Sequence, residues 1–210
     1  MTSKAYDDFL ILINFTDPHK LAQVIGKPAP ADGEDAENFG WLNTSRDAKI
    51  FDFGQGTGII GRLLTEQSFT NIEGADASPY FCGVARDSGW YQNVREFWFG
   101  RGIDQLPQEW IGAYDLVVGS GVFLEGHIPC SGFDDAFEMT KVGGYFVTSI
   151  RHHYWENGHE FGYKDKIDSL IAAGKIELLK TWTFMRGRKD NPDPLFAELE
   201  SFMFVCRRIA

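Results

Sequence analysis

A glycine-rich turn and one downstream carboxylate carry the clearest chemical signal in this sequence. Residues 52–58 read Asp-Phe-Gly-Gln-Gly-Thr-Gly and follow a short apolar segment. Glycines let a backbone turn sharply and approach a ligand closely, and a helix that starts at such a turn presents its free N–H groups to that ligand. Asp76 ends the next apolar segment, where a carboxylate can accept hydrogen bonds from ribose hydroxyls. The spacing therefore predicts a nucleotide-binding site.

Two classes of nucleotide are compatible with this turn. Gly56, Gly58 and Gly61 match the dinucleotide fingerprint, in which Gly61 would let the helix pack closely on the strand. This match predicts an NAD-dependent oxidoreductase. The competing pattern starts at Asp52, whose carboxylate at the strand end would attract a cation. S-adenosylmethionine carries a sulfonium and an ammonium and no phosphate, so an anion beside the turn favours it over a pyrophosphate.

Histidines supply the candidate proton acceptors. A methyl transfer needs a base only when the acceptor must lose a proton, and His127, which follows the fourth predicted strand on the ligand side, is the candidate catalytic residue. The alternative is a histidine that only orders its loop. His152 and His153 follow the fifth predicted strand, and one of them should point away because neighbours on an extended chain face opposite sides. With His159 they lack a metal-ligand spacing, so no metal site is predicted.

Strands and helices that could position these residues alternate along the chain. Short apolar runs predict strands at residues 49–53, 71–76, 96–99, 114–118, 144–150, 175–184 and 200–207. Helical spacing predicts helices at residues 59–67, 133–140 and 163–173. A further helix should begin with Ser78 as its N-cap and Pro79 as its first residue.

This alternation predicts an α/β protein, a Rossmann-like three-layer sandwich with a mostly parallel seven-stranded sheet. No helix separates the last two strands, so they should form an antiparallel C-terminal hairpin. Ligands of such sheets bind beyond the carboxyl ends of the strands, where the strand order reverses. We predict a single domain over residues 1–210, with residues 1–47 as a helical and loop cap and residues 48–210 as the core.

Aromatic and loop segments near the expected site have more than one interpretation. Tyr154 and Trp155 either line an acceptor pocket or belong to the edge of the core. Residues 97–99, Phe-Trp-Phe, are expected in the sheet core rather than stacked on a cofactor. Residues 27–45 contain prolines, glycines and acids and predict a long surface loop. Residues 186–189, Arg-Gly-Arg-Lys, predict a solvated hairpin turn.

Composition narrows the expected partners and compartment. A formal net charge of −10 repels phosphate backbones, so nucleic acid is not an expected partner. The three cysteines form no Cys-x-x-Cys pair and predict neither a zinc site nor disulfides. No run approaches the roughly 20 apolar residues of a membrane span, and the N-terminal residues lack the basic front of a signal peptide. We expect an intracellular protein, in the cytoplasm or alternatively in an organelle.

Four motifs, in the right order, resemble those of class I S-adenosylmethionine-dependent methyltransferases. They are residues 49–58 (first motif), 72–79 (second motif), 114–118 (fourth strand) and 141–147 (the later Leu-Lys-Pro-Gly-Gly turn), and together they cover about residues 48–150. Three further segments, residues 119–129, 151–155 and 174–178, are similar to the Williams–Beuren-region methyltransferase-like group. The resemblance implies S-adenosylmethionine as cofactor and a methyl acceptor, a small molecule or a protein, that is not identified.

The resemblance also implies a role for each residue that matches a motif. Asp52, Gly54, Gly56 and Gly58 would face the methionine part of the cofactor. Asp76 would hold the ribose, and Ala77 and Ser78 would flank the adenine. Ser120, Gly121 and Val122 would border the reacting methyl group.

Some positions depart from the family pattern. Gln55 stands where the first motif has a small residue and would crowd the pocket. The alignment places Arg101 or Gly102 where the family has an acid that accepts a hydrogen bond from adenine. Since a guanidinium only donates, weak cofactor binding is expected. Little chain precedes Tyr6. A second hypothesis is therefore a methyltransferase-like subunit without catalysis that serves a protein assembly.

Overall fold

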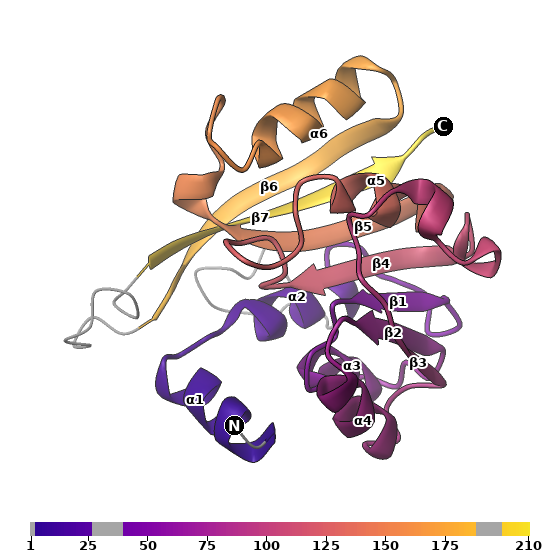
Figure 1. The fold of residues 1–210 in the computed structure, drawn as a ribbon, viewed down its shortest axis with the longest axis vertical. Helices are drawn as coiled ribbons and strands as arrows, with labels where there is room; N and C mark the ends of the chain where they lie inside the picture. Colours follow the sequence, from indigo (N-terminus) through magenta and orange to yellow (C-terminus); the bar gives the residue numbers. More distant parts are fainter. Residues whose placement is uncertain (1–2, 27–39, 188–198) are drawn as a thin grey trace.

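A single seven-stranded sheet organises the protein. The structure, a computed structural model, describes residues 3–26, 40–187 and 199–210. The strands are β1 (Ile50–Phe53), β2 (Ile72–Asp76), β3 (Asn93–Glu96), β4 (Tyr114–Ser120), β5 (Thr140–Arg151), β6 (Ile176–Arg186) and β7 (Leu199–Arg208). They lie in the order β3-β2-β1-β4-β5-β7-β6 (Figure 1). Strands β1 to β5 pair in parallel and β7 runs antiparallel to β5 and β6, so the predicted fold class and C-terminal hairpin are confirmed.

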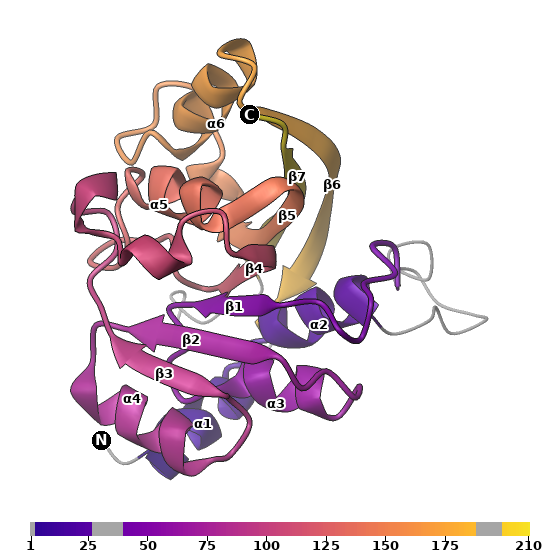
Figure 2. The same cartoon turned by 90° about the vertical axis from the view of Figure 1, so that its right-hand side faces the viewer.

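Helices cover both faces of this sheet and make the predicted three layers. They are α1 (Ser3–Leu12), α2 (Asp17–Gly26), α3 (Ile59–Thr65), α4 (Pro79–Asp87), α5 (Gly132–Met139) and α6 (Tyr163–Ala172). Helices α2 and α3 lie on one face, and α5 and α6 on the other (Figure 2). Helix α4 packs on β2 and β3. Short 3-10 turns also occur: η2 (Ile103–Gln105), η3 (Gln108–Trp110) and η4 (His152–Tyr154). No described helix is long and apolar enough to cross a bilayer.

Strand β1 shows why the sheet is buried on both faces. All four of its residues are buried, and successive side chains point to opposite sides. Ile50 joins the apolar cluster of Leu21 and Ile60 under α2 and α3. Phe51 joins the opposite cluster, where its ring meets that of Trp110 at 4.9 Å. A continuous apolar strand of this kind is typical of parallel sheets.

The third strand lies earlier in the chain than residues 96–99, and that prediction is wrong. The strand ends at Glu96, which pairs with Asp76, and the chain then leaves the sheet. Phe99 stacks on Phe53 with ring centroids 3.7 Å apart, and the Phe97 ring contacts that of Trp110. The aromatic run has the composition of a strand, but packing across the end of the sheet stabilises it instead.

Two segments predicted as loops are described only in part. Residues 27–39 of the predicted 27–45 loop lie outside the described residues, and its remainder is held by backbone bonds such as Leu42 N–H to Val24 O at 3.1 Å. Of the predicted turn at residues 186–189, positions 188 and 189 lie outside the described residues. Arg186 itself ends β6 and pairs with the buried Asp17 (Nη1–Oδ1 3.4 Å), so this arginine is part of the packed structure and not of a solvated turn.

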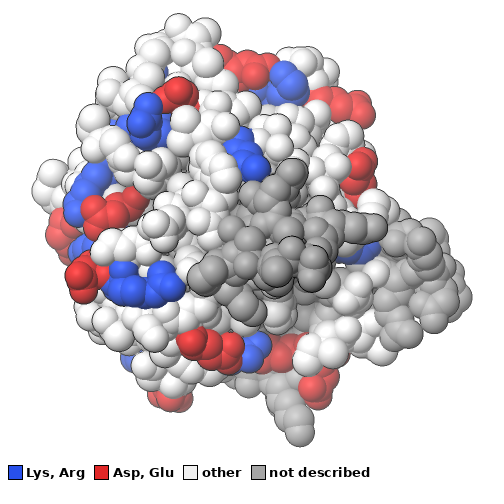
Figure 3. Space-filling view, turned by 180° about the vertical axis from the view of Figure 1, so that it is seen from behind, with Lys and Arg blue, Asp and Glu red and all other residues white. Residues whose placement is uncertain are grey.

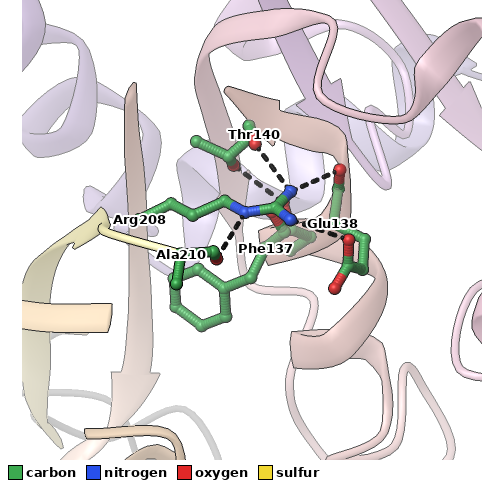
Figure 4. Close-up of polar contacts among 6 residues, drawn as sticks. Phe137, Glu138, Thr140, Arg208 and Ala210 are labelled. Atoms are coloured by element: carbon green, nitrogen blue, oxygen red, sulfur yellow. Dashed lines mark hydrogen bonds and ion pairs between the residues drawn. The ribbon is translucent and has the colours of Figure 1, made fainter. Parts of the chain in front are cut away.

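Arg208, near the C-terminus, ties β7 to the end of α5 (Figure 4). Its Nη1 donates to the backbone carbonyls of Phe137, Glu138 and Thr140 at 2.8, 2.8 and 3.0 Å, and its Nη2 pairs with the Glu138 carboxylate. The last carbonyls of a helix have no partner within the helix, and a cation there also complements the helix dipole. One partly buried side chain thus closes α5 and fixes the hairpin against it.

Replacing Arg208 should cost much more stability than replacing its neighbour. Arg208→Gln removes charge-assisted bonds to helix carbonyls and should lower the free energy of unfolding by roughly 1.5–3 kcal/mol. Arg207→Gln is the matched control, because Arg207 makes an exposed pair with Glu177 that is worth less than about 1 kcal/mol. Urea unfolding measures both; equal losses would contradict the anchoring role of Arg208.

Candidate functional site

A cavity of about 380 Å³ lies where the strand order reverses, between the ends of β1 and β4. Its volume falls within the roughly 300–1,000 Å³ of small-molecule sites. Its polar and turn residues come from the ends of β1, β2 and β4 and from the loops that follow them: Asp52, Gly54, Gln55, Gly56, Thr57, Asp76, Ala77, Ser78, Ser120, Gly121, Gly126 and His127. Its apolar residues include Tyr6, Leu10, Phe15, Phe81, Phe97, Trp98, Phe99, Val122 and Ile128. The sequence-predicted position of the site matches this cavity.

The glycine turn after β1 leaves space for a ligand at one position and is tightly packed at another. Gly54 has a φ of +72°, and a Cβ there would lie 2.8 Å from Val122 Cγ1, so a larger residue would both strain the backbone and clash. Gly56 has a φ of +55°, and a Cβ there would meet nothing within 4 Å. The backbone at Gly56 therefore borders open space in the cavity, where a ligand can approach it.

The carboxylate of Asp76 connects this turn to the start of α4. Its Oδ2 accepts the Gly56 N–H at 3.0 Å and its Oδ1 accepts the Ser78 N–H at 2.8 Å. Ser78 also caps α4 as predicted, because its hydroxyl accepts the Phe81 N–H and Pro79 follows as the first helical residue. Each carboxylate oxygen retains a free lone pair, since an ionised carboxylate accepts about four hydrogen bonds. Asp76 can thus hold two ligand hydroxyls.

Asp52 lines the cavity, but its carboxyl group is buried and bonded to Tyr91. It is 1% exposed, and its Oδ2 accepts the Tyr91 hydroxyl at 2.6 Å. Burial raises the pKa of Asp52 to about 7, against the opposing effect of the Tyr91 hydrogen bond. The predicted attraction for a cationic ligand therefore comes from a carboxyl group that titrates near neutral pH and bonds first to Tyr91.

Gly61 makes room for the Tyr91 ring. A Cβ on Gly61 would lie 2.3 Å from Tyr91 Cζ, and the Gly61 N–H donates to the Tyr91 hydroxyl at 3.1 Å. The third glycine of the dinucleotide-like spacing thus serves a buried hydrogen-bond network with Asp52. Close packing of helix on strand, the function of that glycine in a dinucleotide site, is not its role here.

Gln55, which was expected to crowd the pocket, lines the cavity with its side chain packed against α4. Its side chain is buried, its Nε2 lies 3.7 Å from Cys82 Sγ on α4, and its Oε1 has no hydrogen-bond partner within the described residues. A Cβ on Gly74 would lie 3.2 Å from this Oε1, so the glutamine packs between β2 and α4. Gly58 is the N-cap of α3 and does not line the cavity.

Arg101 and Gly102 also lie outside the cavity lining. Asp135 and Ser131 of the α5 region bind the backbone of Gly100, through Oδ2 to its N–H at 2.6 Å and Oγ–H to its carbonyl at 2.8 Å. These bonds pull the segment after β3 toward α5. The Arg101 guanidinium then lies 4.7 Å from the Trp98 ring, while Phe97 and Trp98 occupy the cavity side.

Helix α1 covers the mouth of the cavity. The Thr57 hydroxyl donates to Asp7 Oδ1 at 2.7 Å, and the rings of Tyr6 and Phe81 are 5.1 Å apart. Burial raises the pKa of Tyr6, with smaller contributions from the charges of Asp76 and Asp7. Among the described residues of the predicted cap at residues 1–47, α1, Phe15 and Pro18 contribute to the cavity lining, while α2 packs mainly on α3 and the sheet.

The loop after β4 provides the opposite wall. Ser120, Gly121, Val122 and His127 all line the cavity. The Ser120 hydroxyl is buried without a partner in the described structure. His127 is exposed, and its Nδ1 lies 3.1 Å from the Glu125 carbonyl, which orients the ring. Nε2 is then the atom available to a substrate.

The residues after β5 form a 3-10 turn instead of an extended chain. His152 pairs with Glu200, and burial lowers the pKa of His153, whose ring lies against Tyr154. Tyr154 is buried in the core, and Trp155 stacks on Phe202 at 4.7 Å. These two aromatics therefore belong to the edge of the core and not to the cavity lining. In the ranges described, no three His, Cys, Asp or Glu side chains are grouped to hold a metal ion.

Several lining residues were not singled out from the sequence. Trp98, which is 53% exposed, and Phe97 were assigned to the sheet core. Phe15 lies against Gly121, where a Cβ would approach the Phe15 ring to 2.7 Å. Tyr91, which does not line the cavity but bonds to Asp52, carries no motif at all. An aromatic run directly after a parallel strand was the one available signal, because that position is the ligand edge of the sheet.

Sequence comparison identifies no relative, whereas structural comparison does. No family model matches the chain, and no curated protein matches it. A TehB-like SAM-dependent methyltransferase from Corynebacterium glutamicum has a TM-score of 0.60 at 18% identity, over 98% of this chain and 97% of its own. TYW2 of M. jannaschii, solved in complex with AdoMet, has a TM-score of 0.58 at 11% identity, over 94% and 77% of the two chains.

A third neighbour comes from a complex between the Trm112 methyltransferase activator of Haloferax volcanii and its candidate methyltransferase. It has a TM-score of 0.59 at 14% identity and covers 95% of this chain and 93% of its own. Identities this low show a common fold. The protein therefore has the Rossmann-like fold of class I SAM-dependent methyltransferases, and these enzymes are its structural neighbours.

Asp52 should make stability depend on pH near neutrality. Its pKa is about 7 in the folded protein against an ordinary value of 3.8, so between these values the folded state holds a proton that the unfolded state has lost. The free energy of unfolding should therefore fall as pH rises from about 4 to 7. Asp52→Asn should remove this part of the slope, and the exposed control Asp47→Asn should not. Unfolding at pH 5, 6, 7 and 8 measures it; parallel curves for all three proteins would exclude the buried carboxyl group as the cause.

Proposed function

We propose that this protein is a methyltransferase that uses S-adenosylmethionine. The observation that carries the proposal is the combination of the open glycine turn and the Asp76 carboxylate at the switch point of the sheet. The methyltransferases of the same fold, one of them solved with AdoMet, support the choice of cofactor. The resemblance of residues 119–129 and 151–155 to the Williams–Beuren-region group narrows the proposal to that subgroup.

The residues present fit this cofactor. Gly54, Gly56 and the backbone of Gln55 would face its methionine part, and the free lone pairs of Asp76 would accept the two ribose hydroxyls. Ala77 and Ser78 would flank the adenine, with the Trp98 ring as a further stacking surface. Asp52 and Asp76 are the acids among the described lining residues, and their charge suits a cationic ligand better than a pyrophosphate.

When bound, the cofactor supplies an electrophilic methyl group on its sulfonium. The acceptor atom would take this methyl group with its lone pair, and the electron pair of the carbon–sulfur bond would remain on sulfur. Ser120, Gly121 and Val122 would border this reaction and hold the two reactants in line, which can provide much of the acceleration. Where the acceptor carries a proton, His127 Nε2 is placed to receive it.

The competing hypotheses have less support. The NAD-dependent alternative rested on Gly56, Gly58 and Gly61, and Gly61 here accommodates the Tyr91 ring. A nucleic-acid acceptor is disfavoured, because Lys and Arg alternate with Asp and Glu over the described rear surface in Figure 3 and the net charge is −10. A protein partner is compatible with the neighbour that binds an activator. A subunit without catalysis would be indicated by failure to bind the cofactor.

Adenosylhomocysteine should raise the melting temperature of the protein, and NAD should not. Asp76→Ala should weaken adenosylhomocysteine binding about tenfold or more, because a charge-assisted hydrogen bond is worth roughly 1.5–3 kcal/mol. Asp104→Ala is the control, since Asp104 is an exposed acid outside the cavity. Calorimetry measures the affinities, and the melting temperature of the unliganded variant separates binding from folding. Equal stabilisation by NAD would contradict the assignment of S-adenosylmethionine as the cofactor.

Trp98, and not Arg101, should control affinity at the adenine end. Trp98→Ala should reduce adenosylhomocysteine affinity about tenfold, because stacking of a base on an aromatic ring is worth roughly 1–3 kcal/mol. Arg101→Asp should change it less than about threefold, since an exposed charge outside the lining is screened by salt. Trp41→Ala is the matched tryptophan control outside the cavity. A gain in affinity for Arg101→Asp would show that this side chain faces the adenine after all.

A further inference from the structure

A second cavity adjoins the first one on the side away from β2. It has a volume of about 200 Å³ and lies between α1, the ends of β4 and β5, and the adjoining ends of β6 and β7. The two cavities share lining residues, namely Tyr6, Leu10, Phe15, Ser120, Gly121 and His127. A molecule in the second cavity would therefore meet the end of the first cavity at which the methyl group is proposed to lie.

The walls of this second cavity are mainly apolar. Aromatic and aliphatic side chains come from α1 and the segment after it, from the loop after β4 and from β7: Phe9, Leu10, Ile13, Phe15, Phe123, Leu124 and Leu199. Such walls exclude water and suit a compact hydrocarbon body. The small volume limits that body to roughly the size of a single ring or a short chain, well below the drug-sized sites of about 300–1,000 Å³.

Three unpaired polar groups interrupt these apolar walls. Ser120 and Ser149 are register partners on β4 and β5, and their buried hydroxyls have no hydrogen-bond partner within the described residues. Ser149 is 1% exposed. The Nε–H of Arg151, two residues further along β5, is also buried and unpaired there. Because buried polar groups are nearly always paired, three such groups around one cavity indicate a polar ligand.

The charged side chains that line the cavity favour an anionic ligand. Arg151 and Arg186 both line it, and its described lining contains no carboxylate. Arg186 is already paired with the buried Asp17, whereas Arg151 has no carboxylate partner among the described residues. One uncompensated guanidinium remains, in a protein whose net charge is −10. A guanidinium donates two parallel hydrogen bonds to a carboxylate.

We propose that the second cavity binds the methyl acceptor and that this acceptor is a small carboxylate with a compact apolar body. Its carboxylate bonds to Arg151 and to the Ser149 hydroxyl, and its nucleophilic atom lies at the Ser120–His127 end. One free guanidinium balances a monoanion, whereas a phosphate dianion would leave a charge uncompensated. This inference rests on the proposed function, since it places the acceptor of the same methyl transfer.

The test uses the full chain saturated with adenosylhomocysteine. Calorimetry compares benzoate, phenylacetate, 3-phenylpropanoate and hexanoate with the amide of each acid and with phenyl phosphate. At least one carboxylate should bind about tenfold more tightly than its own amide and than phenyl phosphate, in keeping with one charge-assisted bond pair. Equal binding of acid and amide, tighter binding of the phosphate, or no binding by any of the four acids would overturn the proposal.

Variants of Arg151 test whether this residue binds the carboxylate. Arg151→Gln should abolish the preference for acid over amide, and Arg151→Lys should retain part of it, because lysine keeps the charge but loses the paired donors. Arg207→Gln, on an arginine outside the cavity, should leave it unchanged. An unchanged preference in Arg151→Gln would count against the proposal. Adenosylhomocysteine binding is measured in the same samples to distinguish the two proposals. If the wild-type protein does not bind adenosylhomocysteine, the proposed methyltransferase function is wrong. If it binds adenosylhomocysteine but none of the carboxylates, only the proposed acceptor class is wrong.

Discussion

The carboxylate of Asp76 accepts backbone N–H groups from Gly56 and from Ser78, and so joins the turn after β1 to the first turn of α4. These two turns come from different crossovers of the sheet, and the common acceptor adds to the backbone bonds from Gly54 and Gln55 to Ala75 O in fixing their separation. The same carboxylate still has lone pairs directed at the cavity. Structural and ligand-binding roles therefore coincide in one side chain.

Below this turn, a buried network supports the cavity floor. Asp52 and Tyr91 share a short hydrogen bond, and the absence of a side chain at Gly61 leaves room for the tyrosine ring. A carboxyl group that is fully buried without a cationic partner resists ionisation, which explains a pKa near 7. Asp52 thus has a structural role, and a cationic ligand in the cavity would favour its ionised form.

The two cavities at the ligand edge of the sheet differ in the charged and polar groups that line them. The larger one has carboxylates and open backbone, and the smaller one has a guanidinium and hydroxyls that lack partners among the described residues. Helix α1 and the residues after it cover both cavities, through the Thr57–Asp7 bond on one side and through Leu10 and Phe15 on the other. A cation and an anion would be bound next to each other in this arrangement, with their reactive atoms meeting beside Ser120 and His127.

Local sequence determined the alternation of strands and helices, the antiparallel hairpin, the Ser78–Pro79 helix start and the placement of Gly54, Gly56 and Asp76, because periodicity and turn chemistry act between near neighbours. Tertiary structure decided what depends on distant partners. The aromatic run at residues 97–99 lies outside the sheet because Asp135 and Ser131 bind the backbone of Gly100. For the same reason Arg101 lies outside the cavity lining. Tyr91, Ser149 and Arg151 acquired their roles only when segments far apart in the chain came together, and no spacing in the sequence encodes those contacts.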